Sequence, residues 1–207
     1  WGQAILGKLA ALPQPVFFIR GNTDPGWIDH QAVNPDQQMY SLNLIPHECR
    51  GHRIAGVSGT LPIPLRSRIG WSEVKRLERL AAMIDSRSIL VAHPPPWGLR
   101  DRVAGRWHAG SRGLRRLIAA KSPAILICGH IHEAAGIAWL GRTLVVNCGV
   151  AARGYHALVE LVELRIAAGL GGKAIALLWG ETPDAEAAEE IAKILTTVDR
   201  LIEKTEP

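Results

Sequence analysis

The stretch ILICGHIHEAAG, from Ile125 to Gly136, is the most informative segment of this 207-residue chain. Its first four residues are apolar and predict a buried strand. A glycine ends that strand, and His130 and His132 follow it one residue apart. Ligands collect at the carboxyl ends of strands in open α/β sheets, and imidazole is the commonest protein ligand for transition metals. The segment therefore predicts an α/β fold with a metal site at a strand end, while two hydrated loop histidines are the alternative.

Two other apolar runs have the same layout. Residues 16–19 predict a short buried strand, and the polar residues Asn22 and Asp24 follow it. Residues 88–92 predict a further strand that ends at His93, and the three prolines after it fix the chain just beyond the histidine. An ordinary turn or a structural histidine would explain either run alone. Because three strands end in this way, we expect their polar residues to share one site.

A glycine-rich loop over residues 105–111 precedes a helix predicted over residues 112–121. Ser111 is the expected N-cap, and the free N–H groups of such a helix start bind anions readily. Gly110 and Ser111 are therefore candidate substrate-binding residues, with an ordinary loop and cap as the alternative. The other patterns predict an irregular segment over 25–50, a strand over 53–59, a helix capped by Ser72, a hairpin over 137–147, strands over 155–164 and 174–179, and an amphipathic helix beginning near residue 182.

The composition is typical of a globular protein, with 47% hydrophobic and 21% charged residues. We expect one α/β domain over residues 1–165 and an appended strand and amphipathic helix over residues 166–207. The net charge is +5, and the basic residues are scattered and form no polybasic run. This pattern fits an anionic small substrate or solvated surface charge, and it does not indicate nucleic-acid binding. The three cysteines lack metal-binding or redox spacing, and no run is long enough to span a membrane, so we expect a cytoplasmic protein.

Three motifs in this order resemble those of the calcineurin-like metallophosphoesterases. They are GNTD at residues 21–24, His93 before PPPWG, and GHIH at residues 129–132. The loop over 105–111 and the segment TLVVNCGV over 143–150 resemble those of the small prokaryotic phosphoesterases in that superfamily. The resemblance covers residues 13–164 and implies a two-sheet α/β/β/α sandwich.

The resemblance also implies a site and a reaction. Asn22, His93 and His130 would hold the second of two divalent metal ions, and His132 would hold the first. Nitrogen and oxygen ligands suit Mn²⁺, Fe²⁺ or Zn²⁺. The implied activity is hydrolysis of a phosphomonoester or phosphodiester of a small molecule by a metal-activated hydroxide.

Two departures from the family pattern affect this expectation. The motifs D-x-H and G-D-x-x-D, which supply the other ligands of the first ion, are absent, so we expect an amino-terminally truncated chain of impaired activity whose natural form has an upstream part. Many members have a histidine as general acid at the position of Thr23, and threonine cannot protonate an alkoxide near neutral pH. His108 is a candidate for that role, and Asp24 is a second candidate catalytic residue.

Two other hypotheses concern binding. The chain could be a catalytically degenerate scaffold that binds a protein partner through the emptied site or its last helix, or a zinc-binding module. A homo-oligomer is possible in each case.

Overall fold

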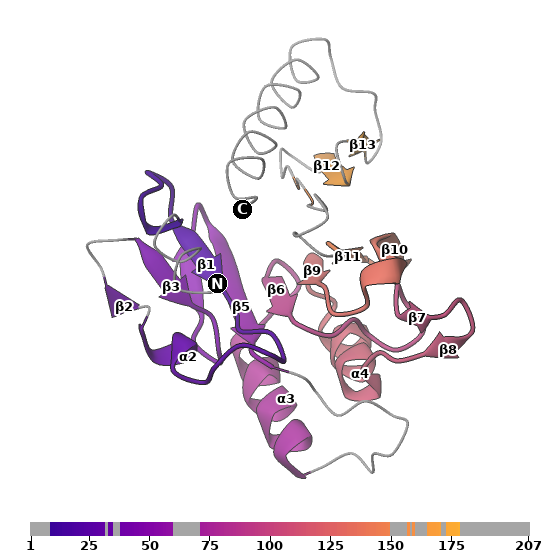
Figure 1. Cartoon of the computed structure of the whole chain (residues 1–207), viewed down its shortest axis with the longest axis horizontal. Coiled ribbons are helices and arrows are strands. Elements are labelled where there is room, and N and C mark those ends of the chain that lie inside the picture. The colour runs from indigo at the N-terminus through magenta and orange to yellow at the C-terminus, as the bar shows by residue number, and fades with distance from the viewer. Residues whose placement is uncertain are drawn as a thin grey trace. The chain divides into compact units, whose positions relative to one another are not determined.

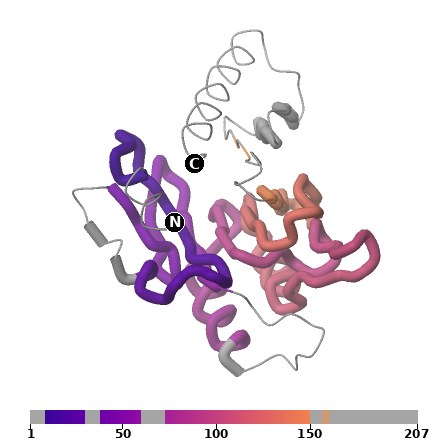
Figure 2. Tube along the Cα trace, viewed as in Figure 1, coloured from indigo at the N-terminus to yellow at the C-terminus, as the bar shows by residue number. Residues whose placement is uncertain are grey.

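We describe the fold from a computed structural model of the whole chain, drawn in Figure 1 and traced as a tube in Figure 2. The chain divides into two compact units, Trp1–Asn147 and Cys148–Pro207. The sequence-based boundary after residue 165 stays a prediction. The residues that the structure describes are 9–31, 33–34, 38–59, 71–149, 157, 159, 165–170 and 173–178.

A six-stranded sheet forms the centre of the first unit, with the order β10-β11-β9-β6-β5-β4. The four middle strands run parallel, while β4 and β10 are antiparallel edge strands. Parallel strands end at the same edge of a sheet, so the residues after β6 and β9 are neighbours. The strands are β4 His47–Cys49, β5 His52–Val57, β6 Ile89–Ala92, β9 Ile125–Cys128, β10 Gly136–Leu140 and β11 Thr143–Asn147.

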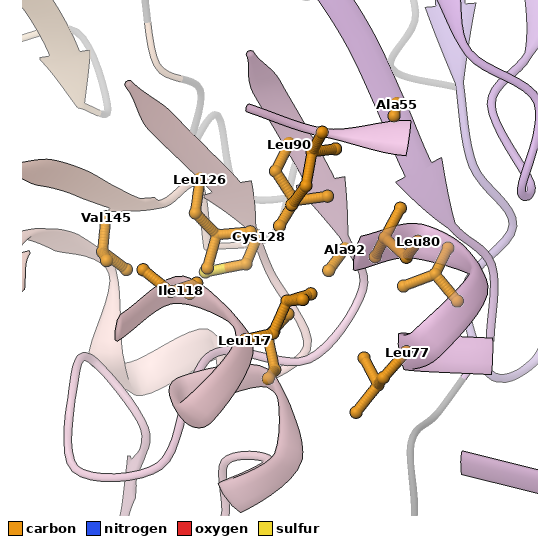
Figure 3. Close-up of a cluster of buried hydrophobic side chains, with 13 residues drawn as sticks. Ala55, Leu77, Leu80, Leu90, Ala92, Leu117, Ile118, Leu126, Cys128 and Val145 are labelled. Atoms are coloured by element: carbon orange, nitrogen blue, oxygen red, sulfur yellow. The ribbon is translucent and has the colours of Figure 1, made fainter. Parts of the chain in front are cut away.

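Two helices, α3 (Trp71–Met83) and α4 (Arg112–Lys121), pack on the sheet. Alternate strand residues point toward them because successive side chains of a strand face opposite sides. Figure 3 shows the resulting core, in which Leu80 of α3 and Ile118 of α4 are fully buried against the strands. The predicted strands over 53–59, 88–92 and 125–128 and the hairpin over 137–147 are confirmed.

The helix starts differ from each other in how well the sequence predicted them. Ser111 is the N-cap of α4, as predicted, and its hydroxyl accepts from the backbone N–H of Leu114 at 2.9 Å. Ser72 is not the cap of α3, because that helix already begins at Trp71. Val74 of α3 is exposed, while Glu73 is buried and accepts a hydrogen bond from the Ser111 hydroxyl.

A second, three-stranded sheet has the order β1-β3-β2, with β1 and β3 parallel. A bridge between Asn43 and Gly56 joins the end of β3 to β5. The prediction of an irregular segment over residues 25–50 was wrong, because elements of two to four residues are too short to show a hydrophobic period. The elements are β1 Val16–Phe18, α2 Ile28–Gln31, β2 Val33–Asn34 and β3 Met39–Ser41.

The other described elements are short. The strands β7 (Arg102–Val103) and β8 (Trp107–His108) form a hairpin, and the 3-10 helix η2 covers His132–Ala134. In the second unit, β12 (Arg165–Leu170) pairs with β13 (Lys173–Leu178), and β13 matches the strand predicted over 174–179. The strand predicted over 155–164 lies almost wholly outside the described residues, and the helix near residue 182 lies outside them entirely.

The predicted fold class, a mixed α/β fold with more than one sheet, is confirmed. Within the described part of the chain, no helix has the length and apolar character needed to cross a membrane.

Candidate metal site

Three segments bring one polar side chain each to the same place. Asn22 follows β1, His93 follows β6 and His130 follows β9. Nε2 of His93 lies 2.9 Å from Oδ1 of Asn22 and 3.1 Å from Nδ1 of His130. The backbone N–H of Gly129 donates to the carbonyl of His93 at 3.0 Å and holds the two strand ends together. The structure thus joins three of the four predicted metal ligands.

The spacing of these atoms fits a metal ion. Imidazole and amide donors lie about 2.1 Å from ions such as Zn²⁺, so neighbouring ligand atoms are about 3.0–3.4 Å apart. The amide oxygen of Asn22 can only accept a hydrogen bond, so its partner, Nε2 of His93, carries the proton. The same N–H group is shared with the second acceptor, Nδ1 of His130. A cation can replace that proton, because all three atoms then present a lone pair.

Burial keeps both imidazoles neutral. Burial first, and then the nearby His130, lower the pKa of His93 to about 4, while Asp24 acts in the opposite direction. Burial, and then the proximity of His132, also lowers the pKa of His130. Neutral imidazole is the form that binds metals, so both rings are ready to bind a cation at neutral pH.

The backbone of His130 is strained. Its φ is +67°, and the N–H of Ile131 donates to the carbonyl of Gly129 at 2.8 Å, which closes a tight γ-turn around the histidine. Side chains other than that of glycine rarely adopt this conformation, which costs about 1–2 kcal/mol. The turn aims the ring at His93, with the ring centroids 4.8 Å apart.

We expect His130→Gly to be more stable than His130→Ala by about 1 kcal/mol, because glycine adopts a positive φ without strain. Both variants lack the imidazole, so their difference isolates the backbone term. Urea denaturation of the two proteins measures it. Equal stability would show that the turn relaxes once the ring is gone.

His132 and Asp24 lie at the margin of the site. His132 is exposed at the start of η2, and among the described residues no hydrogen bond joins it to His93 or His130. Asp24 accepts from the backbone N–H of Gly21 at 2.7 Å, which shapes the turn that carries Asn22. Metal binding by His132 and catalysis by Asp24 stay predictions. In the described segments, no three histidine, cysteine, aspartate or glutamate side chains form a metal-binding group, so Asn22 is essential to the candidate set.

A buried carboxylate, not predicted from the sequence, supports the loop after β1. Asp29 of α2 accepts from Nε of Arg20 at 3.1 Å, from Nδ2 of Asn43 at 3.0 Å and from the hydroxyl of Ser58 at 2.6 Å. The Ser58 hydroxyl in turn accepts from the backbone N–H of Arg20 at 3.0 Å. These bonds tie the residues just before Asn22 to the end of β5. The sequence around Asp29 has no motif that could have revealed this role.

Gly110 and Ser111, the predicted substrate-binding residues, make structural contacts. The Ser111 side chain is buried, and its hydroxyl caps α4 and donates to Glu73 at 2.9 Å. The backbone N–H of Gly110 donates to Oδ2 of Asp101 at 3.0 Å. These contacts occupy the donors that an anion would need, so they do not favour a substrate contact, which stays a prediction.

His108 lines a pocket beside the metal site. The pocket lies between the β7–β8 hairpin and η2, and its wall includes Arg100, Asp101, Arg102 and Glu133. Nδ1 of His108 donates to Oδ1 of the fully buried Asp101 at 2.7 Å. The sequence analysis singled out His108 but missed its partner, because a buried aspartate in a loop has no sequence signature of its own.

The chain is similar to several known proteins in sequence. The profile of the family described as "Metallophosphoesterase, calcineurin superfamily" matches residues 70–170. The uncharacterized protein MJ1162 of Methanocaldococcus jannaschii is 26% identical over 155 residues, which are 70% of each chain. The UPF0046 protein K07C11.7 of Caenorhabditis elegans is 33% identical over 84 residues, which are 38% of this chain and 28% of the nematode protein.

Solved structures share the fold. One crystal structure matches 86% of this chain and 70% of its own, with a TM-score of 0.62 and 20% identity. The crystal structure of TT1561 of Thermus thermophilus matches 81% of this chain and 76% of its own, with a TM-score of 0.57 and 21% identity. At this level of identity the likeness concerns the fold alone.

Proposed function

We propose that the chain, whose residues 70–170 match the profile of the metallophosphoesterases of the calcineurin superfamily, hydrolyses a phosphoester bond with the help of divalent metal ions. The proposal rests on one observation: Nε2 of His93 lies within 3.1 Å of both Oδ1 of Asn22 and Nδ1 of His130. Three atoms with free lone pairs, each on a residue that follows a strand, form a rigid set of donors on one side of a cation site. This arrangement supports a metal-dependent hydrolase better than a scaffold.

Each residue has a defined role in this proposal. Asn22, His93 and His130 would hold one ion, and the exposed His132 would contribute to a second. Bound ions of this kind activate water and neutralise the negative charge of a phosphate. The oxygen and nitrogen donors are compatible with Mn²⁺, Fe²⁺ or Zn²⁺. The strained turn at His130 and the hydrogen bonds of Asp29 keep the donors in place before an ion binds.

The substrate we propose is a small phosphomonoester or phosphodiester. Arg100 and Arg102 in the pocket wall favour an anionic ligand, and Glu133 on the opposite wall limits the net positive charge. Thr23 in the GNTD motif is a poor acid for the leaving group, which leaves that role to another group. A cytoplasmic location and a homo-oligomer stay predictions.

Hydrolysis of bis(4-nitrophenyl) phosphate with and without Mn²⁺ tests the proposal. The assay should use this chain and its His130→Ala variant. We expect turnover that requires Mn²⁺ and is lost in the variant, because the substitution removes one of three converging donors.

Turnover without added metal in chelator-treated protein, or turnover that His130→Ala leaves intact, would contradict the mechanism. No turnover despite Mn²⁺ binding would favour the scaffold alternative.

A further inference from the structure

We propose that His108 and Asp101 form an acid pair that protonates the leaving group of the phosphoester in the pocket between the β7–β8 hairpin and η2. The inference rests on the proposed hydrolase function and adds the group that protonates the leaving group. Water forms the new bond to phosphorus and releases its proton to solvent. As the bond from phosphorus to the ester oxygen breaks, the imidazolium form of His108 gives its Nε2 proton to that oxygen, and the product leaves as an alcohol or phenol. The ring keeps the Nδ1 proton that Asp101 accepts and regains the Nε2 proton from solvent.

Asp101 fixes the orientation of the imidazole. Its Oδ1 accepts from Nδ1 of His108 at 2.7 Å, and its Oδ2 accepts from the backbone N–H groups of Gly98 at 2.9 Å and Gly110 at 3.0 Å. A fully buried carboxylate held at three points cannot rotate. The bond to Nδ1 leaves Nε2 as the nitrogen that can act on a ligand. Among the described residues, no hydrogen bond reaches that nitrogen.

Packing also holds the ring in place. Trp97 lies against His108 with ring centroids 5.1 Å apart. The guanidinium of Arg112 lies over the Trp97 ring, 4.8 Å from the ring centre. His108 therefore has a rotamer set by its neighbours, as a catalytic acid requires.

The pocket adjoins the metal site through two short connections. Nδ2 of the buried Asn147 donates to the carbonyl of Ile131, next to His130, at 3.0 Å and to the carbonyl of Arg100, next to Asp101, at 2.9 Å. The backbone N–H of Ala104 in the hairpin donates to Oε1 of Glu133 in η2 at 3.2 Å. The loops that carry His130 and His108 are thus joined, and we expect a phosphoester held near His130 to direct its leaving group toward His108.

The chemistry of the site calls for such an acid. An ion at this site would occupy Nε2 of His93 and Nδ1 of His130, so neither of these two atoms could then donate a proton to the ester. His108 is the histidine among the residues that line the pocket, and its side chain is 28% exposed.

The test compares two esters that differ only in their leaving group, methyl 4-nitrophenyl phosphate and methyl phenyl phosphate. The full chain is assayed with Mn²⁺ as wild type, His108→Gln and Asp101→Asn. We expect His108→Gln to lower kcat/KM for the phenyl ester by about 100-fold and for the nitrophenyl ester by less than about threefold, because 4-nitrophenolate leaves without a proton.

Asp101→Asn separates positioning from folding. An asparagine oxygen can still accept from Gly98 and Gly110, but its NH₂ group then faces Nδ1 of His108 and moves the ring proton to Nε2. We expect the same selective loss for the phenyl ester as in His108→Gln. In ¹⁵N spectra of labelled histidine recorded over a range of pH, we expect the wild-type ring to change between the doubly protonated form and the Nδ1–H form, and the neutral ring of the variant to be in the Nε2–H form.

The control is His47→Gln, which removes an imidazole that packs against Phe17 and Tyr40, away from the pocket. It should leave the ratio of the two rates unchanged. Equal losses for both esters, an unchanged ratio in His108→Gln, or a wild-type His108 in the Nε2–H form would overturn the acid pair. Absence of turnover of either ester by the wild type would overturn the hydrolase function and the acid role with it.

Discussion

Replacing His93 with alanine is expected to weaken Mn²⁺ binding by at least about 100-fold and to lower metal-dependent kcat/KM by about 1,000-fold. His93 is the central donor of the three, because its Nε2 lies within 3.1 Å of both Asn22 and His130. No hydrogen bond of the site joins Oδ1 of Asn22 directly to Nδ1 of His130. Loss of the His93 imidazole therefore leaves two separate donors instead of three that converge on one ion.

Metal affinity should be measured by competition with a chromophoric chelator on untagged protein, since a histidine tag would bind the same ions. His47→Ala is the matched control, because it removes a half-buried imidazole from the Phe17 and Tyr40 cluster and should keep the wild-type affinity. His132→Ala tests the remaining predicted ligand. Wild-type affinity in His93→Ala would exclude the proposed site.

Replacing Gly110 with alanine is expected to cost at least about 3 kcal/mol of folding stability. A Cβ at this position would lie 2.7 Å from the carbonyl carbon and oxygen of Pro96 and from the nitrogen of Trp97. These backbone atoms cannot move aside, because the N–H of Trp97 donates to the carbonyl of Ser111 at 2.9 Å and the N–H of Ser111 donates to the carbonyl of Pro95 at 2.8 Å. The new methyl group must break this pairing.

Urea denaturation of the wild type and the Gly110→Ala protein measures the loss. Gly26→Ala is the matched control, because a Cβ there meets no atom within 4 Å, and its effect should stay within about 0.5 kcal/mol. The outcome also decides between two roles for Gly110. Wild-type stability with reduced substrate affinity would favour the substrate contact predicted from the sequence over the structural role.

Much of the candidate site could be predicted from the sequence because its signals are local. An apolar run followed by a polar residue identifies a strand end, which is why Asn22, His93 and His130 stand out in the sequence alone. The cap at Ser111 is local for the same reason, since its partner is Leu114, three residues away. Such features depend on hydrogen-bonding capacity and hydrophobic period within a few residues.

Other features depend on contacts between distant segments and had no sequence signal. The elements over residues 28–49 are too short for a period and exist because β3 and β4 pair with other strands. Asp29 pairs with Ser58, 29 residues away, and the positive φ of His130 belongs to the tight turn between β9 and η2.

By itself, the sequence determined the types of the main elements and the candidate ligand residues that follow three of them, because backbone preference and side-chain chemistry are properties of each residue. Only the tertiary structure decided that Asn22, His93 and His130 meet around one point and that Asp101 holds His108. Those distances depend on the register of parallel strands and on the packing of loops from separate parts of the chain, which no local pattern contains.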